Sequence, residues 1–188
     1  MITRRMAMLG FAALMANARE ALAHKTGEPF VLDSKYMPQI VAFPAEHPAG
    51  TVVIDPQNRF LYLIQGDGTA LRYGVGVGKA GLAWSGTAEI ARKAKWPSWT
   101  PTPNMIKRDP KKYARYAGGV PGGPNNPLGA RALYLYRNGR DTFYRIHGTN
   151  EPWTIGKAVS NGCIRMLNEH VSDLYERVSI GAKVVVLN

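Results

Sequence analysis

The chain is divided into short runs rich in β-branched and aromatic residues, and each run stops at a turn signal. Residues 51–55 and 60–64 form one pair of such runs, and the Pro-Gln-Asn-Arg between them predicts a β-hairpin. Residues 132–136 and 142–146 form a second pair, separated by the strong hairpin signal Asn138-Gly139. The 20 glycines and 13 prolines among 188 residues also favour many turns over long helices. We predict a mostly β domain, either a sandwich or a partly open barrel.

Further strands are expected at residues 71–77, 88–95 and 183–187. The first of these runs into the glycine-rich sequence Gly74-Val-Gly-Val-Gly78, which indicates a bulge or a close approach of two backbones. Only one segment has the period of a helix. It begins at Asn168, which we expect to cap it, and places Val171, Leu174, Tyr175 and Val178 on one buried face.

Residues 96–129 form a long stretch rich in proline and glycine. Loops of this length in small domains are often lids or binding surfaces. The alternative is a solvated surface excursion with short helical turns, and each basic side chain taken singly fits that alternative. These basic residues are Lys107, Arg108, Lys111, Lys112 and Arg115.

The N-terminus has the organisation of a cleavable export signal. Arg4 and Arg5 precede a mostly apolar run at residues 6–18, and Ala21-Leu22-Ala23 fits a signal-peptidase site. The run is shorter than the roughly 20 residues that a membrane-spanning helix needs. We predict a signal peptide at 1–23, with an uncleaved anchor as the alternative and with Sec or twin-arginine export left open. Residues 24–49 are expected to form an extended arm.

The formal net charge of +11 predicts attraction to polyanions and carries no information about the fold. Cleavage after residue 23 removes three arginines and one glutamate and leaves about +9. Export disfavours nucleic acid as the partner and favours the anionic polymers of a bacterial wall. After cleavage, no stable membrane insertion is expected.

The chain has a single cysteine, Cys163, so no disulfide can form within it. A lone cysteine is most often a small buried hydrophobe. Exported proteins, however, usually pair their cysteines. A free thiol in such a protein is therefore expected to have a use.

His147 precedes Cys163 by 16 positions, at the end of a predicted strand. A free thiol is mostly protonated at neutral pH and becomes a useful nucleophile when an imidazole takes or shares its proton. Adjacent strand ends bring two such side chains together. Gly162 would allow close approach of a substrate, and the amides of Gly162 and Cys163 are expected to stabilise an oxyanion. The alternative for His147 is a structural role at the strand end.

The residues around this pair resemble the signature of the L,D-transpeptidases with a YkuD-type catalytic domain. That signature is a His-Gly, a linking stretch with a glycine, and Ser-His-Gly-Cys followed by an aliphatic residue and Arg or Asn. The resemblance extends over about residues 51–187. The matching segments here are His147-Gly148-Thr149, Gly156, Ser160-Asn-Gly-Cys-Ile-Arg-Met166, and the upstream stretches 97–103 and 126–132.

The resemblance implies a β-sandwich-like catalytic domain at residues 50–188, with one helix in its C-terminal half and a long Pro/Gly-rich loop. It implies that Cys163 is the nucleophile, His147 the general base, and the Gly148 carbonyl the group that orients the imidazole. Ser160 would shape the pocket. Arg165 would lie near the charged groups of the substrate, or else tie its strand to an acid such as Glu169 or Asp173.

The sequence departs from the family pattern at Asn161, where a histidine is usual. By the resemblance, this position chiefly lends its backbone and a polar side chain, so we expect activity to survive. The implied substrate-binding set is completed by Gly162, beside Arg165, Ser160 and Asn161.

The implied reaction is acyl transfer on peptidoglycan stem peptides. The thiol attacks a tetrapeptide stem, releases D-Ala and forms a thioester, which an amine of another stem, or of an outer-membrane protein or lipoprotein, then resolves. Water as acceptor would make the protein an L,D-carboxypeptidase, and a non-catalytic peptidoglycan-binding module is a further alternative. A papain-like peptidase is disfavoured, because its cysteine usually precedes its histidine. No cofactor is expected, and the four histidines and one cysteine lack the spacing of a zinc site.

Overall fold

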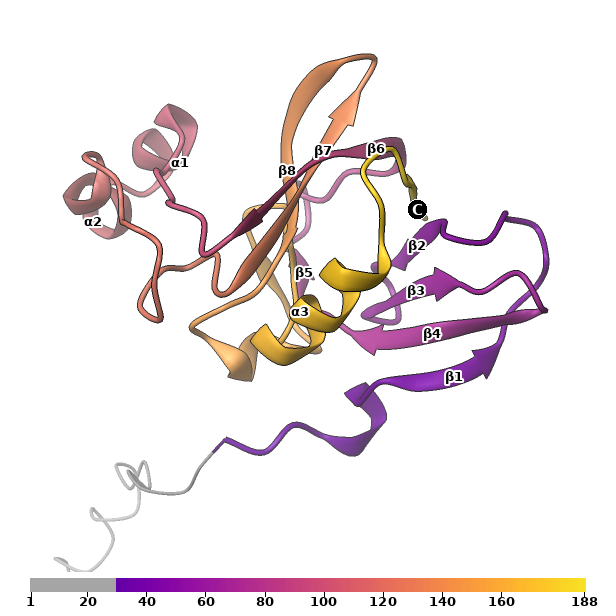
Figure 1. Ribbon diagram of the computed structural model, residues 1–188. Helices are drawn as coiled ribbons and strands as arrows, with labels where there is room; N and C mark the ends of the chain where they lie inside the picture. The colour runs from indigo at the N-terminus through magenta and orange to yellow at the C-terminus, as the bar shows by residue number, and fades with distance from the viewer. Residues whose placement is uncertain (1–29) are drawn as a thin grey trace, which may run out of the picture. The chain divides into compact units, whose positions relative to one another are not determined.

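Nine strands within residues 30–188 form one mixed sheet (Figure 1). The structure is a computed structural model that describes these residues. The predicted signal peptide at 1–23 and the first part of the predicted arm lie outside them. The sheet has the strand order β1-β4-β3-β2-β11-β6-β7-β8-β10. Its strands are β1 (Gln39–Ala42), β2 (Val52–Asp55), β3 (Phe60–Ile64), β4 (Thr69–Gly74), β6 (Gly86–Lys95), β7 (Arg131–Arg137), β8 (Arg140–His147), β10 (Ile164–Arg165) and β11 (Lys183–Val186).

Two shorter strands pair in parallel outside this sheet, β5 (Val77–Gly78) with β9 (Ala158–Ser160). The helical elements are short, apart from α3. They are η1 (Ser34–Tyr36), α1 (Pro103–Arg108), α2 (Pro110–Tyr113), η2 (Ala114–Tyr116), η3 (Pro152–Thr154) and α3 (Asn168–Arg177). None of the described helices has the length and apolarity needed to cross a membrane.

The two halves of the sheet share one apolar core. Residues of β2, β3 and β4 pack in the same cluster as residues of β6, β7, β8 and α3. Beyond β4, the backbone of Gly76 exchanges hydrogen bonds of 2.8 and 2.7 Å with Arg165 in β10, so the segment after β4 is joined to the strand at the far edge of the sheet. A Cβ at Gly76 would lie 2.6 Å from the carbonyl oxygen of Thr154, which explains the glycine. The predicted mostly β, sandwich-like fold is confirmed.

Both predicted hairpins are present. Strand β2 pairs antiparallel with β3, and β7 pairs antiparallel with β8. Asn138 and Gly139 in the second turn both have positive φ, of 50° and 72°. A two-residue turn of type I′ requires that conformation, which asparagine and glycine adopt most easily.

The segment expected as an extended arm contributes the edge strand β1, which pairs antiparallel with β4. The preceding turn η1 packs Tyr36 against two glycines. A Cβ at Gly74 would lie within 2.3 Å of Tyr36, and one at Gly156 would meet the Tyr36 ring at 2.5 Å. Gly156 also has a φ of +82°, so both its space and its conformation exclude a side chain.

Helix α3 buries Val171, Leu174 and Tyr175 against the sheet, as predicted, and Val178 is buried just beyond its last residue. The predicted cap is wrong. Asn168 is the first helical residue and makes no capping bond. Its Oδ1 instead accepts hydrogen bonds from the backbone amides of Ala130 and Thr149, at 3.0 and 3.1 Å. The side chain therefore joins three segments that are distant in sequence.

The long loop at 96–129 carries α1, α2 and η2, which lie beyond one end of the sheet (Figure 1). Thr102 caps α1, Asp109 caps α2, and a proline occupies the first turn of each helix. No residue of these three elements is buried. Local capping, rather than an apolar face, thus holds these helices in shape.

Candidate active site

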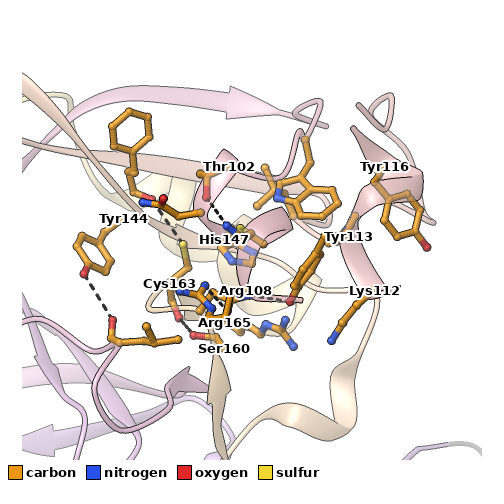
Figure 2. A pocket seen from close by; sticks show the side chains of 18 of the residues that line it. Thr102, Arg108, Lys112, Tyr113, Tyr116, Tyr144, His147, Ser160, Cys163 and Arg165 are labelled. Atoms are coloured by element: carbon orange, nitrogen blue, oxygen red, sulfur yellow. Dashed lines mark hydrogen bonds between the residues drawn. The ribbon is translucent and has the colours of Figure 1, made fainter. Parts of the chain in front are cut away.

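A cavity of about 450 Å³ lies between two parts of the chain (Figure 2). One part is the C-terminal end of β8 with the neighbouring β10, and the other is the segment that carries α1 and α2. The sequence predicts seven site residues. Gly148 and Gly162 do not line the cavity. The five that line it are His147, Ser160, Asn161, Cys163 and Arg165.

Strand pairing places the histidine and the cysteine at this cavity. Strand β10 runs parallel to β8, with Arg165 opposite His147. The amide of Met166 donates to the His147 carbonyl at 2.8 Å. Cys163 lies immediately before β10. The expected approach of two adjacent strand ends is therefore how the fold brings these residues together.

His147 is buried, with 4% of its surface exposed, and its Nδ1 lies 2.5 Å from the carbonyl oxygen of Gly148. A carbonyl oxygen only accepts hydrogen bonds, so Nδ1 must carry the proton and Nε2 is left as a free base. Burial, together with the positive charge of Arg165, lowers the pKa of His147 to about 3. The imidazole is therefore neutral at physiological pH.

Cys163 is half-buried, and its Sγ donates a hydrogen bond to the carbonyl oxygen of Phe143, 3.8 Å away. Desolvation by the surrounding protein raises the pKa of the thiol. The resting pair is accordingly a neutral thiol and a neutral imidazole. Both shifts favour the uncharged pair over a thiolate–imidazolium pair with a lowered thiol pKa.

Ser160 braces the turn that carries the cysteine. Its Oγ donates to the Cys163 carbonyl at 2.6 Å and accepts from the Gly162 amide at 3.1 Å. The expectation that the Gly162 amide serves an oxyanion is thus wrong, because Ser160 already occupies it. A glycine is required at position 162 by its protein neighbours, and not by the approach of a substrate as expected. A Cβ there would lie 2.5 Å from the Tyr144 ring and 2.7 Å from the Leu82 carbonyl oxygen.

Arg165 forms an ion pair with Glu151, with 2.7 Å between Nη1 and Oε2. Neither of the acids considered from the sequence, Glu169 and Asp173, is its partner. Asp173 instead accepts from the Tyr73 hydroxyl at 2.5 Å and pairs with Arg177. Arg165 still lines the cavity, so the ion pair orients the guanidinium there without removing it from the site.

Asn161 connects the turn to the opposite wall of the cavity. Its Nδ2 donates to the Tyr113 hydroxyl at 2.7 Å, and its Oδ1 accepts from Arg108 Nη2 at 3.0 Å. Both partners belong to the α1–α2 segment. Sequence reasoning marked that stretch as a lid or binding surface but did not assign Arg108 or Tyr113 to the site.

Phe143 is a further residue of the cavity that the sequence does not predict. It has a φ of 61°, rare for a bulky residue, and 70% of its surface is exposed beside the cavity. Its amide donates to Asp141 Oδ1 at 2.8 Å, and Arg145 holds the same carboxylate through two bonds of 2.7 Å. This brace aims the Phe143 carbonyl at Cys163. No local signal of the Thr-Phe-Tyr-Arg run reveals such a bend.

The described residues contain no group of three His, Cys, Asp or Glu side chains placed to hold a metal ion. The chemistry that the cavity offers comes from one thiol, one neutral imidazole and several cationic side chains. Its aromatic walls add apolar contact area. They are formed by Trp99, Tyr113, Tyr116, Phe143 and Tyr144.

Comparison with known proteins places this arrangement in a family. The profile of the YkuD family, described as the L,D-transpeptidase catalytic domain, matches residues 49–186. "Probable L,D-transpeptidase ErfK/SrfK" of Escherichia coli is 35% identical over 81% of this chain and 48% of its own length. The chain thus spans about half the length of the curated relatives it matches.

Two solved structures show the same fold. One, from Brucella melitensis, is named "Probable carnitine operon oxidoreductase caia". It is 56% identical, covers 83% of this chain and 96% of its own, and has a TM-score of 0.57. An L,D-transpeptidase from Mycobacterium smegmatis is 18% identical, covers 73% and 58%, and has a TM-score of 0.52. With a family profile that spans most of its length, the chain belongs to the YkuD family of L,D-transpeptidase catalytic domains.

Proposed function

We propose that this protein is a peptidoglycan L,D-transpeptidase with Cys163 as nucleophile and His147 as general base. It would form a thioester with a tetrapeptide stem, release D-Ala, and transfer the acyl group to an amine. The observation that carries the proposal is the pairing of β8 with β10, which brings a neutral imidazole with a free Nε2 and the chain's single thiol to one cavity.

The first half-reaction follows from the protonation states. The thiol is protonated at rest, so its proton must leave as sulfur attacks, and Nε2 of His147 is the base that can take it. The sulfur–carbon bond forms at the carbonyl of the L-configured centre. The carbon–nitrogen bond to D-Ala then breaks, and the departing amine takes the proton from the imidazolium. The Gly148 carbonyl would stabilise that imidazolium.

The second half-reaction reverses the proton path. An acceptor amine attacks the thioester carbon, gives its proton to Nε2, and the sulfur leaves to become the thiol again. The oxyanion would be stabilised by the Cys163 amide, which has no protein acceptor within residues 30–188. The lowered pKa of His147 favours return of the proton from the imidazolium to the sulfur or to the departing amine.

The proposed substrate is anionic, and the cavity is cationic. Arg108, Lys112, Arg115 and Arg165 line it, against one acid, Glu151. We further propose that the protein acts outside the cytoplasm, in the periplasm or cell wall, after removal of residues 1–23. The acceptor would be a neighbouring stem or a wall-bound protein or lipoprotein, which determines whether the product is a cross-link or an anchored protein.

The test is incubation of the protein lacking residues 1–23 with purified tetrapeptide muropeptides, followed by mass spectrometry of the products. Dimers, or adducts with a supplied amine, accompanied by free D-Ala, support transpeptidation. Loss of D-Ala without transfer would indicate the carboxypeptidase instead. Binding without any product would indicate a non-catalytic module.

Cys163→Ala should abolish every product at nearly unchanged Tm, because it removes the nucleophile at little packing cost. His147→Gln should reduce turnover almost as far, since glutamine cannot act as a base. Persistent D-Ala release by Cys163→Ala would overturn the proposal. An intact acyl-enzyme mass on Cys163 in a short incubation would identify the thioester directly.

A further inference from the structure

The cationic side chains of the cavity are not held alike. Arg165 is neutralised by Glu151. Lys112 and Arg115 lie over the rings of their neighbours Tyr113 and Tyr116. Among these side chains, only Arg108 is oriented by a residue of the turn that carries Cys163. Its Nη2 donates a 3.0 Å hydrogen bond to Asn161 Oδ1. Figure 2 draws Arg108, Cys163 and Arg165 around the same cavity.

The positive charge of Arg108 is available to a ligand in the cavity. Its side chain is exposed, and no acid within residues 30–188 forms an ion pair with it. A guanidinium has five N–H donors in a planar fork, so the bond to Asn161 leaves most of them available. A carboxylate is the group that such a fork binds best.

The Asn161 side chain contacts the α1–α2 segment through both its carbonyl oxygen and its amide nitrogen. The carbonyl end accepts from Arg108, and the amide end donates to the Tyr113 hydroxyl at 2.7 Å. Because an amide offers a donor and an acceptor at every pH, the link does not depend on a protonation state. The α1–α2 segment has no buried residue to fix its distance from the turn, so this link supplies a restraint that packing does not.

We propose that Asn161 is a positioning residue that holds the guanidinium of Arg108 over the cavity, and that Arg108 thereby selects substrates with a carboxylate close to the scissile carbonyl. The substrate part of this inference rests on the proposed function. The placement of the charge does not, and it can be tested on the thiol alone.

Two small alkylating reagents report the charge beside Cys163. Iodoacetate is an anion and iodoacetamide is neutral, and both transfer their carbon to sulfur with release of iodide. Changes in thiol pKa, His147 or access affect both rates, so the ratio of the two rate constants isolates the local potential. Arg108→Gln and Asn161→Ala should each lower the iodoacetate-to-iodoacetamide ratio roughly fivefold at low ionic strength, with the drop shrinking in salt.

The double variant makes the claim specific. If Asn161 acts through Arg108, then Asn161→Ala should lower the ratio no further once Arg108 is glutamine. Tyr113→Phe, which removes only the second bond, should produce a smaller drop. Lys107→Gln is the matched control, because it removes the same charge from the exposed surface of α1, outside the cavity lining, and should leave the ratio unchanged.

A ratio that stays at the wild-type value in Asn161→Ala, or additive drops in the double variant, would overturn the positioning role. Equal drops in Lys107→Gln and Arg108→Gln would show that only net charge matters. If muropeptides are turned over, both site variants should raise KM much more than they lower kcat, and a stem whose carboxylate is amidated should lose that sensitivity. Absence of turnover would contradict the proposed function, but it would not affect the conclusion from the alkylation rates.

Discussion

The two walls of the cavity are built in opposite ways. On the catalytic wall, four residues are at most 4% exposed, and strand pairing or a backbone bond to a strand holds each of them: His147, Ser160, Ile164 and Met166. On the facing wall, α1, α2 and η2 contain no buried residue. That wall is held by caps, by the contacts of Trp99 with two tyrosine rings, and by the two bonds of Asn161.

This difference separates two requirements. The proposed chemistry needs a fixed geometry of the thiol and the imidazole, which buried, hydrogen-bonded strands provide. A surface that has to admit a large ligand benefits from local opening, and elements with few buried contacts open at low free energy. We therefore expect changes in the catalytic wall to cost global stability and changes in the facing wall to alter local motion and recognition.

The largest expected effect comes from Asn168, which supports the backbone next to His147 and Gly148. Asn168→Ala removes the acceptor shared by the amides of Ala130 and Thr149, both in buried residues. Two unsatisfied buried donors should lower the free energy of unfolding by about 2–4 kcal/mol, measured by urea denaturation. Asn168→Asp keeps the acceptor oxygen and should lose less than half as much. Equal losses in the two variants would show that the shared acceptor does not matter.

Helix α3 and its first residue, Asn168, illustrate what the sequence can and cannot predict. Helical spacing correctly placed Val171 and Leu174 in the core, because that pattern depends only on the period of the helix. The cap was wrong because a side-chain oxygen near a helix start serves whichever donors the tertiary fold presents. Hairpins followed from local turn chemistry, whereas the pairing of β10 with β8 and of β1 with β4 depends on chain segments far apart.

The second prediction concerns acid. The pKa of His147 is about 3 in the folded protein, below its ordinary value near 6.5. Between these pH values the unfolded chain binds a proton that the folded one does not, so stability is full above pH 6.5 and falls as the pH drops. By pH 5 the loss should approach about 2 kcal/mol. Denaturation at pH 8 and pH 5 measures it.

His147→Gln supplies the control for this loss, because glutamine does not titrate. The pKa of His170 is also lowered by burial, but that histidine is present in both proteins and its effect cancels in the difference. The variant should therefore lose less stability than the parent between the two pH values. Equal pH slopes would mean that the pKa of His147 is the same in the folded and the unfolded chain.

The functional residues divide along the same line as the walls. Cys163, His147 and Arg165 were predicted from a short motif, and the structure places all three at the cavity. Arg108 and Tyr113 escaped prediction, because the contact that brings them to Asn161 joins loops about 50 residues apart. Phe143 escaped because its backbone conformation is imposed by Asp141 and Arg145.

The third prediction uses that conformation. Glycine adopts a φ of 61° without strain, whereas phenylalanine adopts it at a cost, so Phe143→Gly should raise the free energy of unfolding by about 1 kcal/mol. Turnover should fall, because the exposed ring beside the cavity is lost. Phe143→Ala removes the ring and retains the strain, so it should lose activity without the gain in stability. Matching stabilities of the two variants would argue against strain at this position.

The smallest expected effect on global stability tests the facing wall itself. Thr102 Oγ accepts from the Met105 amide at 3.2 Å and caps α1. Loss of such a cap costs a helix about 1 kcal/mol. Because α1 buries no residue, Thr102→Ala should change the global free energy of unfolding by less than about 0.5 kcal/mol. Hydrogen exchange of the α1 amides, in contrast, should accelerate roughly fivefold, while exchange in β8 stays unchanged.

Asp109→Ala removes the corresponding cap of α2, at the Lys112 amide, and should behave in the same way there. Together the two variants loosen the facing wall without touching the catalytic one. Iodoacetamide should then react with Cys163 as fast as before or faster, since the cavity opens more often while the base and the thiol keep their places. A loss of global stability comparable to that of Asn168→Ala would mean that α1 unfolds together with the sheet, and the two walls would then form a single cooperative unit.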